Sequence, residues 1–465
     1  MELCLLLGIC FMTARAEAVV YHPTIHFMPS HRAVGDVMPF YWKGEYHVFF
    51  LTNPTGNHDV HWEHCVSTDL VHWKQLSPAL APDPTDPTGP EGGCMFTGCV
   101  VEKDGLFHAW YTSWNPRNPK GREFLSHATS RDLITWTKHP EHRIAPDGVH
   151  FANHHDRDFR DPQIFWNDKA GQYWMHILGN VPGKKGPHFG LLTSKDLVKW
   201  KQVGTVEGVP GDECPDYFRI GDTHYIHSCR RYCYSDKLEG PYKYAKLTNE
   251  LDMPCIIAAK RVWDGKRHVW FGGWRTGGPM AMPREVYAGP DGLLYMKPVD
   301  EVINVFQHTV FDLADKPKFT QTGSQWRLDG AVLQAEGSQA GSLALFDVPD
   351  NYMLDCQVKL ATESHFTIAM RRQDATGDAY RLTLLPGKGQ LSFVGPGIKR
   401  TRPCPVDTSK PVNIQVFVQG RLIECFVNDQ FAQTCRAPHY ASGKLALSLD
   451  GGEAEVVKLL VKKHE

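Results

Sequence analysis

The sequence predicts an all-β protein, a five-bladed β-propeller followed by a C-terminal β-sandwich. The first observation is a repeat: similar segments at Ser67–Trp73, Ser130–Trp136 and Ser194–Trp200 recur at a period of roughly 60 residues. The second is that short β-rich runs alternate with Gly, Pro, Asn and Asp up to residue 304, with little helical periodicity. The third is a change to strong two-residue alternation in residues 317–465.

The repeats define the blades of the propeller, which we place at residues 19–304. Each copy combines a Ser-x-Asp turn, in which short polar side chains bond the local backbone, with a Trp that we expect to pack between neighbouring sheets. A weaker relative at Tyr234–Tyr244 and a strand cluster at Lys266–Trp274 bring the units to five. Four-stranded units of this size fit a ring of blades around an axis. Residues far apart in sequence can then meet at one mouth.

The C-terminal third, residues 317–465, is predicted to form an antiparallel β-sandwich. Segments such as Tyr352–Leu360 and Asn413–Gln419 alternate in polarity, and turn signals separate them. Residues 305–316 are the expected linker between the two domains.

Residues 1–18 have the pattern of a signal peptide. The apolar run Leu3–Met12 is followed by two Ala-x-Ala sequences between residues 14 and 18, although Glu2 stands where a positive charge is usual. The run is too short to cross a bilayer, and no later run of about 18 apolar residues occurs, so we expect no membrane span. The sequence therefore predicts a secreted or periplasmic protein.

Charge and composition exclude some partners. The 50 Lys and Arg residues nearly balance 52 Asp and Glu, and no basic block stands out, so we expect no nucleic-acid partner. The abundant aromatic residues suit a sugar-binding cleft as well as a packed core. The cysteines lack the CxxC spacing of a zinc site. The close pairs Cys94/Cys99 and Cys229/Cys233 could form disulfides in an oxidising compartment, and the sequence leaves this open.

Three acidic residues, Asp36, Asp161 and Glu213, each precede a predicted strand in blades one, three and four. Each can be a simple turn residue. Together they suggest glycosidic-bond cleavage, which commonly uses two carboxyl groups, one as nucleophile or base and one as proton donor. The apolar neighbours Cys214 and Pro215 predict surroundings for Glu213 that would favour its protonated form.

The motifs around these carboxylates resemble glycoside hydrolase family 32, the invertase, levanase and inulinase group of clan J. The matching segments are Asp158–Trp166, Glu213–Phe218, His61–Asp83, Met95–Val101 and Met282–Val302. The resemblance covers nearly the whole mature chain and implies a five-bladed propeller with a following sandwich. It also implies that Asp161 holds fructose hydroxyls and stabilises the transition state, and that Glu213 is the acid/base.

The resemblance departs from the family pattern at the nucleophile. The family carries its nucleophile in Trp-Met-Asn-Asp-Pro-Asn-Gly, whereas residues 32–44 read Arg-Ala-Val-Gly-Asp-Val-Met-Pro-Phe-Tyr-Trp-Lys-Gly. Counting back from Lys43 places the family's aspartate at Gly35, so we assign Asp36 as nucleophile through a one-residue shift. Leu51 stands where the family usually has a substrate-binding glutamine, which implies an altered fructose subsite and a substrate that could be a modified fructan or another furanoside.

Further candidates complete the predicted site. The residues expected to bind substrate are Arg160, Trp62, Phe96, Thr97 and Trp274. Thr97 replaces the serine of a family Phe-Ser-Gly motif, and Arg160 could orient Asp161 or Glu213 through a charge-assisted bond. Trp62, Trp114 and Trp274 could instead pack the blades. We expect no metal and no cofactor, because the adjacent histidines within Asn153–Asp158 would diverge.

The sequence thus predicts a secreted glycoside hydrolase that cleaves terminal fructofuranosyl, or related furanosyl, linkages by a retaining two-carboxylate mechanism. Its expected partner is an oligo- or polysaccharide, a fructan or a sucrose-like sugar. Two alternatives stay open: an inverting, arabinofuranosidase-like enzyme, and a non-catalytic carbohydrate-binding propeller suggested by the shifted nucleophile motif.

Overall fold

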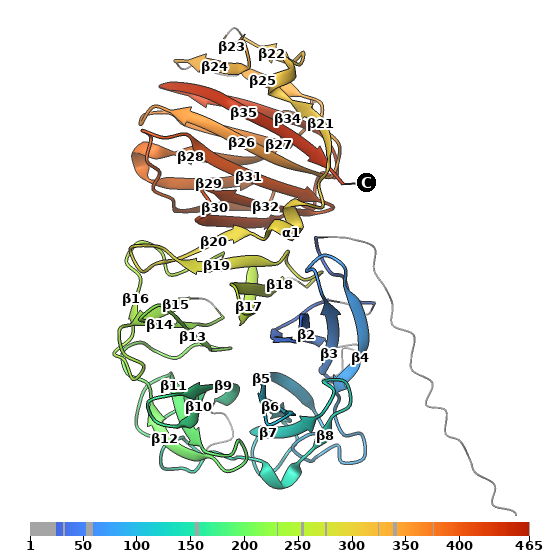
Figure 1. The fold of residues 1–465 in the computed structure, drawn as a ribbon, viewed down its shortest axis with the longest axis vertical. Coiled ribbons are helices and arrows are strands. Elements are labelled where there is room, and N and C mark those ends of the chain that lie inside the picture. Colours follow the sequence, from blue (N-terminus) through green and yellow to red (C-terminus); the bar gives the residue numbers. More distant parts are fainter. Residues whose placement is uncertain are drawn as a thin grey trace, which may run out of the picture.

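The all-β architecture expected from the sequence is confirmed. The computed structural model describes residues 25–464 except 31–32, 53–58, 154–157, 230, 253–254, 275–276, 324, 338–341 and 375. A ring of five sheets lies below two larger sheets in Figure 1. The proposed signal segment, residues 1–18, and the adjacent histidines at 154 and 155 lie outside the described residues.

Each sheet of the ring is a four-stranded antiparallel meander in sequence order. Blade one contains β1 (Val37–Trp42), β2 (Glu45–Thr52), β3 (His61–Ser67) and β4 (Lys74–Leu80), and blade two β5 (Cys94–Lys103), β6 (Leu106–Trp114), β7 (Glu123–Ser130) and β8 (Thr137–Lys138). Blade three contains β9 (Phe159–Asn167), β10 (Gln172–Asn180), β11 (Pro187–Ser194) and β12 (Lys201–Thr205). Blade four contains β13 (Asp216–Ile220), β14 (Thr223–His227), β15 (Tyr232–Ser235) and β16 (Lys243–Tyr244), and blade five β17 (Ile256–Trp263), β18 (His268–Trp274), β19 (Arg284–Ala288) and β20 (Leu294–Pro298).

The repeated segments form the turn between the third and fourth strands, as expected. In the first copy, the Ser67 hydroxyl accepts the backbone N–H of Leu70 and Asp69 accepts that of Val71. The residue after the aspartate adopts a left-handed conformation in all three copies, with φ between 63° and 67°. Local side-chain acceptors compensate for this uncommon backbone conformation.

The tryptophan that ends each repeat packs against the preceding blade, which confirms its expected role. Trp136 of blade two contacts Phe49 of blade one at a ring-centroid distance of 5.9 Å. Trp200 of blade three contacts Trp110 of blade two, also at 5.9 Å. Trp73 of blade one meets the ring of Phe271 in blade five at 6.0 Å, so the same contact helps to close the propeller.

The segment before β1 also closes the ring. The backbone N–H of Val34 donates to Gly278, and that of Met280 donates to Phe27. The chain therefore enters blade one only after it has bonded to the loop of blade five, which fixes the start of β1 at the axis.

The two larger sheets pack face to face around one apolar core, which confirms the sandwich. One contains β21 (His308–Asp312), β23 (Trp326–Asp329), β24 (Val332–Glu336), β26 (Tyr352–Leu360), β31 (Val412–Gln419), β32 (Leu422–Val427), β33 (Phe431–Arg436) and β35 (Glu453–Lys463). The other contains β22 (Thr320–Thr322), β25 (Leu343–Phe346), β27 (His365–Arg372), β28 (Tyr380–Leu385), β29 (Gln390–Gly395), β30 (Ile398–Pro403) and β34 (Lys444–Asp450).

The expected linker is more ordered than the sequence indicated. A short helix, α1 (Asp300–Ile303), ends the propeller, and residues 305–316 then contribute β21 and a 3₁₀ turn at Leu313–Asp315. Strand β21 pairs with β35, so most of this stretch belongs to the sandwich. Among the described residues, the cysteines of both candidate disulfides are free thiols. Within the same part of the chain, no helix has the length and apolar character needed to cross a bilayer.

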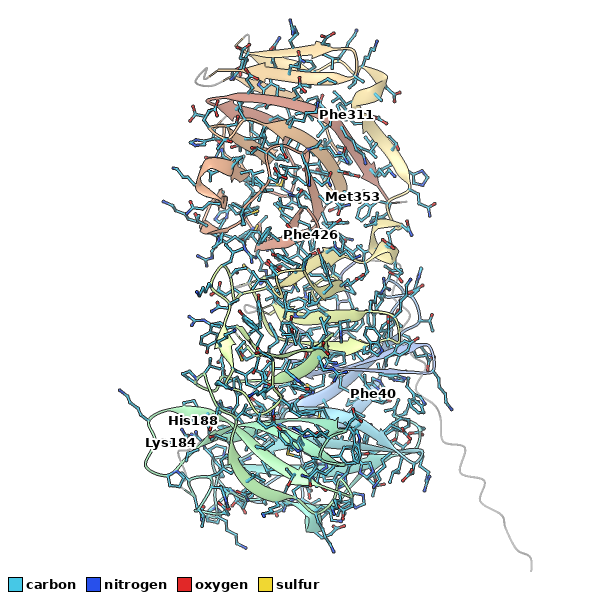
Figure 2. The ribbon with its side chains drawn as sticks, turned by 60° about the vertical axis from the view of Figure 1, so that its left-hand side comes forward. Phe40, Lys184, His188, Phe311, Met353 and Phe426 are labelled. Atoms are coloured by element: carbon cyan, nitrogen blue, oxygen red, sulfur yellow. The ribbon has the colours of Figure 1, made fainter. Side chains whose placement is uncertain are left out.

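The sandwich rests on blade five through a shared apolar cluster. Met353 and Phe426, which lie at the end of the sandwich nearest the propeller in Figure 2, belong to the same cluster as Trp270 and Met296 of blade five. At the centre of this interface Arg284 is fully buried. Its guanidinium pairs with Asp252 and, at 2.5 Å, with Glu424 of β32.

The contribution of the interface ion network to the free energy of unfolding can be measured. In Arg284→Met, two carboxylates stay buried without their cation, so we expect the free energy of unfolding to fall by about 3–5 kcal/mol. The matched control Lys458→Met removes the cation of a half-exposed pair with Asp355 and should cost about 0–1 kcal/mol. Urea denaturation compares the two variants, and equal effects would show that the buried network does not anchor the interface.

Candidate active site

The predicted carboxylates converge on one cavity of about 510 Å³ at the axis of the ring. Its wall includes the three acidic residues expected from the sequence, Asp36, Asp161 and Glu213. The other residues of the wall are Leu51, Phe96, Thr97, Trp114, Arg122, Glu123, Asp158, Arg160, Cys214, Cys229, Ile257 and Ala258. The cavity therefore draws on all five blades or the loops that join them.

Asp36, and not Gly35, presents its side chain to this cavity. Leu51 of β2 is bonded to both residues, because it accepts the N–H of Gly35 and donates its own N–H to the carbonyl of Asp36. A Cβ atom at Gly35 would lie 2.7 Å from the carbonyl oxygen of Leu51. A side chain at position 35 would clash there, so in this backbone the carboxylate that reaches the cavity comes from position 36.

The first strands of several blades carry the same local irregularity at the cavity. In β5, β9 and β17 the pairing register shifts, so that two consecutive residues lie opposite one residue of the neighbouring strand. The two residues are Phe96 and Thr97 in β5, Asp161 and Pro162 in β9, and Ala258 and Ala259 in β17. A β-bulge bends a strand and re-aims its side chains. Gly35 and Asp36 opposite Leu51 repeat this pattern at the start of β1. The bulges turn the selected side chains toward the axis.

Asp161 lies inside β9 rather than before it, which corrects the sequence expectation. Its φ of 63° is uncommon for a residue with a side chain. The backbone N–H of Asp161 donates to the hydroxyl of Thr112 on β6 at 2.8 Å. This bond from the neighbouring blade replaces the ladder bond lost at the bulge and holds the carboxylate toward the cavity.

Cys214 links the two aspartates. Its thiol donates to Asp36 Oδ2 at 3.4 Å, its backbone N–H donates to Asp161 Oδ2 at 3.0 Å, and its φ is 56°. Burial, together with the two carboxylates, raises the pKa of the thiol well above its usual value, so it stays protonated as a donor. Asp36 also accepts a 2.5 Å hydrogen bond from Thr97.

Glu213 occupies a different environment from the two aspartates. Its side chain is 43% exposed, and Oε1 accepts a 2.9 Å charge-assisted bond from Arg160. The same guanidinium also binds Asp158 and Glu123. The expected apolar surroundings of Glu213 are therefore wrong, because its direct partner is a cation and its other face is open to solvent.

Burial dominates the electrostatics of the aspartate pair. Desolvation raises the pKa of Asp36, the hydrogen bonds from Thr97 and Cys214 oppose the shift, and the charge of Glu213 adds to it. Desolvation raises the pKa of Asp161 to about 7, against the lowering effects of Arg160 and the N–H of Cys214 and with a further rise from Asp36. The charge of Glu213 thus acts on Asp36 and the charge of Asp36 on Asp161, so the titrations of these carboxyl groups are not independent.

A buried lysine under the cavity partly offsets this charge. Lys260 of β17 is 2% exposed, and its ammonium donates to the carbonyl of Gly98 at 3.0 Å. Its charge lowers the pKa of both Asp36 and Asp161. Sequence reasoning missed Lys260, since one lysine in an apolar strand gives no signal of its position. It also missed Thr112, Glu123 and the linking role of Cys214.

The predicted substrate-binding residues separate into two groups. Arg160, Phe96 and Thr97 line the cavity, and Phe96 stacks on Trp114 with ring centroids 5.3 Å apart, forming an aromatic wall. Trp62 does not line the cavity. It is fully buried and donates its indole N–H to the carbonyl of Phe96, so it supports that wall from behind.

Trp274 lies beside the main cavity rather than in it. It lines an adjoining space of about 350 Å³ that also contacts Asp36, Leu51 and Phe96. Contact with a sugar at the main cavity would therefore need a ligand that extends past Leu51. Among the described residues that line the main cavity there is no histidine. Asp36 accepts hydrogen bonds from Thr97 and Cys214, Asp161 accepts one from Cys214, and Glu213 accepts one from Arg160.

Sequence comparisons identify a matching family model and similar proteins. The family model described as "Glycosyl hydrolases family 32 N-terminal domain" matches residues 26–253. Raffinose invertase of Escherichia coli is 26% identical over 482 aligned residues, which cover 93% of each chain. Levanase of Bacillus subtilis (strain 168) is 32% identical over 236 residues, 46% of this chain and 32% of that protein.

Structural comparison supports the same fold. The crystal structure of fructan 1-exohydrolase IIa from Cichorium intybus superimposes with a TM-score of 0.74 at 18% identity, covering 95% of this chain and 96% of that one. Sucrose-6-phosphate hydrolase from Lactobacillus gasseri gives a TM-score of 0.72 at 20% identity, covering 96% and 93%. Propeller and sandwich are therefore shared along both chains.

The raised pKa of Asp161 predicts a pH-dependent stability. The native state keeps this proton up to about pH 7, whereas the unfolded chain loses it near pH 4, so wild-type stability falls across that interval. Asp161→Asn removes the titration. As the pH rises through this interval, we expect the free energy of unfolding of the variant, relative to that of the wild type, to increase by on the order of 1.4 kcal/mol per pH unit. Urea denaturation at a series of pH values measures this difference.

The matched control is Asp132→Asn. Slight burial raises the pKa of Asp132, but hydrogen bonds from the backbone N–H groups of Thr135 and Ile134 and from the Ser130 hydroxyl lower it below its usual value. Its stability difference from the wild type should stay constant between about pH 5 and pH 8. Parallel pH profiles for Asp161→Asn and the wild type would contradict the assignment.

Proposed function

The chain belongs to glycoside hydrolase family 32 and is a β-fructofuranosidase-like glycosidase, and on this premise we propose that it removes terminal fructofuranosyl units with retention of configuration. The observation that carries the proposal is the meeting of Asp36, Asp161 and Glu213 at one cavity with different surroundings. Retaining hydrolysis needs such a division between a nucleophile and a proton donor.

Asp36 is the proposed nucleophile. Its Oδ2 accepts from Thr97 and Cys214, which fixes the carboxylate in the cavity wall. Attack on the anomeric carbon would form a covalent glycosyl intermediate and release the leaving oxygen. Thr97 and Cys214 would hold the carboxylate in place and stabilise it again when the intermediate is hydrolysed.

Glu213 is the proposed acid/base. It must give a proton to the leaving oxygen and then take one from water, so it needs contact with both substrate and solvent. Its half-exposed position at the cavity wall meets this need. Arg160 orients the carboxyl group through the 2.9 Å bond and links its position to that of Asp161.

Asp161 is the proposed brace for the sugar ring. Positive charge develops on the ring as the glycosidic bond breaks, and a buried carboxylate next to the hydroxyls becomes more favourable as this charge grows. The bulge in β9 holds Asp161 in position before substrate arrives, so little reorganisation is needed in the transition state.

The substrate proposed is a sucrose-like or fructan sugar with a β-fructofuranosyl end. The names of relatives include raffinose invertase and levanase, and a solved structure of a variant of fructan 1-exohydrolase IIa from Cichorium intybus is in complex with 1-kestose. Leu51 contributes an apolar side chain to the wall. It would leave a nearby sugar hydroxyl without a protein partner, so we propose a fructose subsite with altered hydroxyl recognition.

The roles of the two carboxyl groups can be separated by leaving-group ability. We expect Glu213→Gln to lower kcat on sucrose by about 10²–10⁴-fold, and to lose much less on an aryl fructofuranoside, whose leaving group needs no proton. Asp36→Asn should be inactive on both. Glu207→Gln, an exposed glutamate in the preceding loop, is the control. Equal losses by Glu213→Gln on both substrates would contradict its role as the acid.

Retention is tested by product stereochemistry. With methanol present as acceptor, we expect ¹H NMR to show the β-methyl fructofuranoside as the first transfer product, since water and methanol attack the same covalent intermediate. An α-product would identify the inverting alternative. Absence of turnover on sucrose, levan, inulin and aryl furanosides would favour the carbohydrate-binding alternative.

We also propose export, on the sequence of residues 1–18 alone. Expression of the full chain in a host with a general secretory pathway should release a product cleaved between residues 16 and 19, as measured by intact mass. Retention of an uncleaved chain in the cytoplasm would contradict export.

A further inference from the structure

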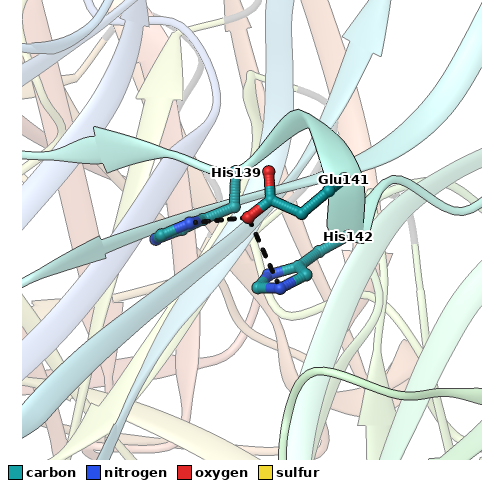
Figure 3. Close-up of side chains that lie close together, drawn as sticks. All are labelled: His139, Glu141 and His142. Atoms are coloured by element: carbon teal, nitrogen blue, oxygen red, sulfur yellow. Dashed lines mark hydrogen bonds and ion pairs between the residues drawn. The ribbon is translucent and has the colours of Figure 1, made fainter.

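A second group of polar side chains lies on the outside of blade two, away from the cavity. Among the described residues, His139, Glu141 and His142 form the group of three potential ligands whose donor atoms lie within 4.8 Å of one another. His139 follows β8, and the other two residues belong to the 3₁₀ turn Pro140–His142. Figure 3 shows one oxygen of Glu141 between the two imidazole rings.

We propose that His139, Glu141 and His142 bind a divalent transition-metal ion of the Zn²⁺ class, with the remaining coordination position open to solvent. Two imidazoles and one carboxylate are a ligand set that zinc accepts, whereas Mg²⁺ and Ca²⁺ prefer oxygen alone. The side chains are 25%, 61% and 24% exposed, so an ion can reach them from solvent.

Two of the three ligand-atom distances within the group are close to those of a metal site, and all three lie within 4.8 Å. Glu141 Oε1 lies 3.2 Å from His139 Nδ1 and 3.6 Å from His142 Nε2. The longer contact exceeds the range of an N–H···O bond. A tetrahedral ion with bonds of about 2.0 Å separates its ligand atoms by about 3.3 Å, a value between the two distances. Rotation of the partly exposed His139 side chain can close the third edge.

The second nitrogen of each imidazole already has a partner, as metal-binding histidines require. His139 Nε2 lies 2.8 Å from the Thr129 hydroxyl, and His142 Nδ1 lies 2.9 Å from His127 Nδ1. His127 is buried and bonds onward to His108 at 3.0 Å. Bonds of this kind hold the ring in place, and when His139 Nε2 and His142 Nδ1 are the donors, the other nitrogen of each ring offers a lone pair to the ion.

The order of protons along this chain of imidazoles follows from its hydrogen bonds, because each neutral imidazole has one donor nitrogen and one acceptor nitrogen. If His127 donates to His108, its Nδ1 accepts the N–H of His142, and Nε2 of His142 is free to bind metal. In the reverse order, His127 donates to Nδ1 of His142, and the proton of His142 then lies on Nε2, where it blocks the metal. A bound ion would therefore select the first arrangement.

Blade one provides an internal comparison. His47 and His64 form the equivalent pair there, with a 3.0 Å bond between their rings. Among the described residues, the far nitrogen of His64, Nδ1, is buried without a hydrogen-bond partner. In blade two the corresponding atom of His127 reaches His142. The histidine pair of blade two thus differs from that of blade one, because its hydrogen bonds continue to His142, which lies beside Glu141 at the surface.

Neighbouring cations do not oppose a metal ion strongly. Lys138 and Arg143 flank the group in sequence, and both pair with Glu91, at 2.8 Å and 3.4 Å. Their charge is therefore directed to another carboxylate. A bound ion would tie the turn Pro140–His142 to β7 and β8, which stabilises the connection that leads on to blade three.

Isothermal titration of ZnCl₂ into chelator-stripped full-length protein tests the site. We expect saturable binding of one ion per chain, and a rise in melting temperature on zinc addition. His139→Ala and Glu141→Gln, both at partly exposed positions, should each weaken affinity at least about 10-fold. His127→Phe, which cannot touch the ion, should weaken it about 10–100-fold by removing the outer bond.

The control is His150→Ala, a surface histidine paired with Asp147 three residues away but without a second imidazole. Its zinc affinity should equal that of the wild type. Absence of saturable binding, or binding unaffected by His139→Ala and Glu141→Gln, would overturn the proposal. Neither result depends on glycosidase activity. The test of the zinc site is therefore independent of the test of the proposed function.

Discussion

Burial of two like-charged carboxyl groups at the axis is the constraint on which the active-site structure depends. Asp161 is buried and Asp36 is partly buried beside it. The charge of Glu213 raises the pKa of Asp36, and the charge of Asp36 raises that of Asp161. A buried carboxylate without donors would be costly. Separate blades supply these donors: Thr97 comes from blade two, and the N–H and thiol of Cys214 come from the segment that leads into blade four. Blade five adds the positive charge of Lys260, which lowers the pKa of both aspartates.

The bulges explain how a regular ring can hold such a site. A regular first strand would point alternate side chains into the sheet packing, where Trp62 and the repeated tryptophans already fill the space between blades. One extra residue per strand turns a side chain to the axis without disturbing that packing. The cost is a left-handed backbone at Asp161 and Ala258, and Thr112 offsets part of it at Asp161.

The fold and the carboxylates could be predicted from the sequence because both have local signals. The repeated turn needs its serine and aspartate, and Arg160-Asp161-Pro162 and Glu213-Cys214 are short motifs. The rest depends on contacts between blades. Nothing local distinguishes buried Trp62 from Trp114 on the cavity wall, or shows that Lys260 reaches under the aspartates. The sequence also offered Asp36 in place of Gly35, but the steric reason, the nearby Leu51 carbonyl, needed the structure.

The exposure of Glu213 shows why motif and neighbours do not give the environment of a side chain. Cys214 and Pro215 suggested an apolar setting, but the backbone turn that buries Cys214, at φ 56°, directs its predecessor to Arg160 at the cavity wall. The same turn therefore places a fixed, buried donor next to the aspartates and a solvent-accessible carboxyl group opposite them. Cys214, with its left-handed backbone, lies between the two environments, and the proposed two-carboxylate mechanism needs their difference.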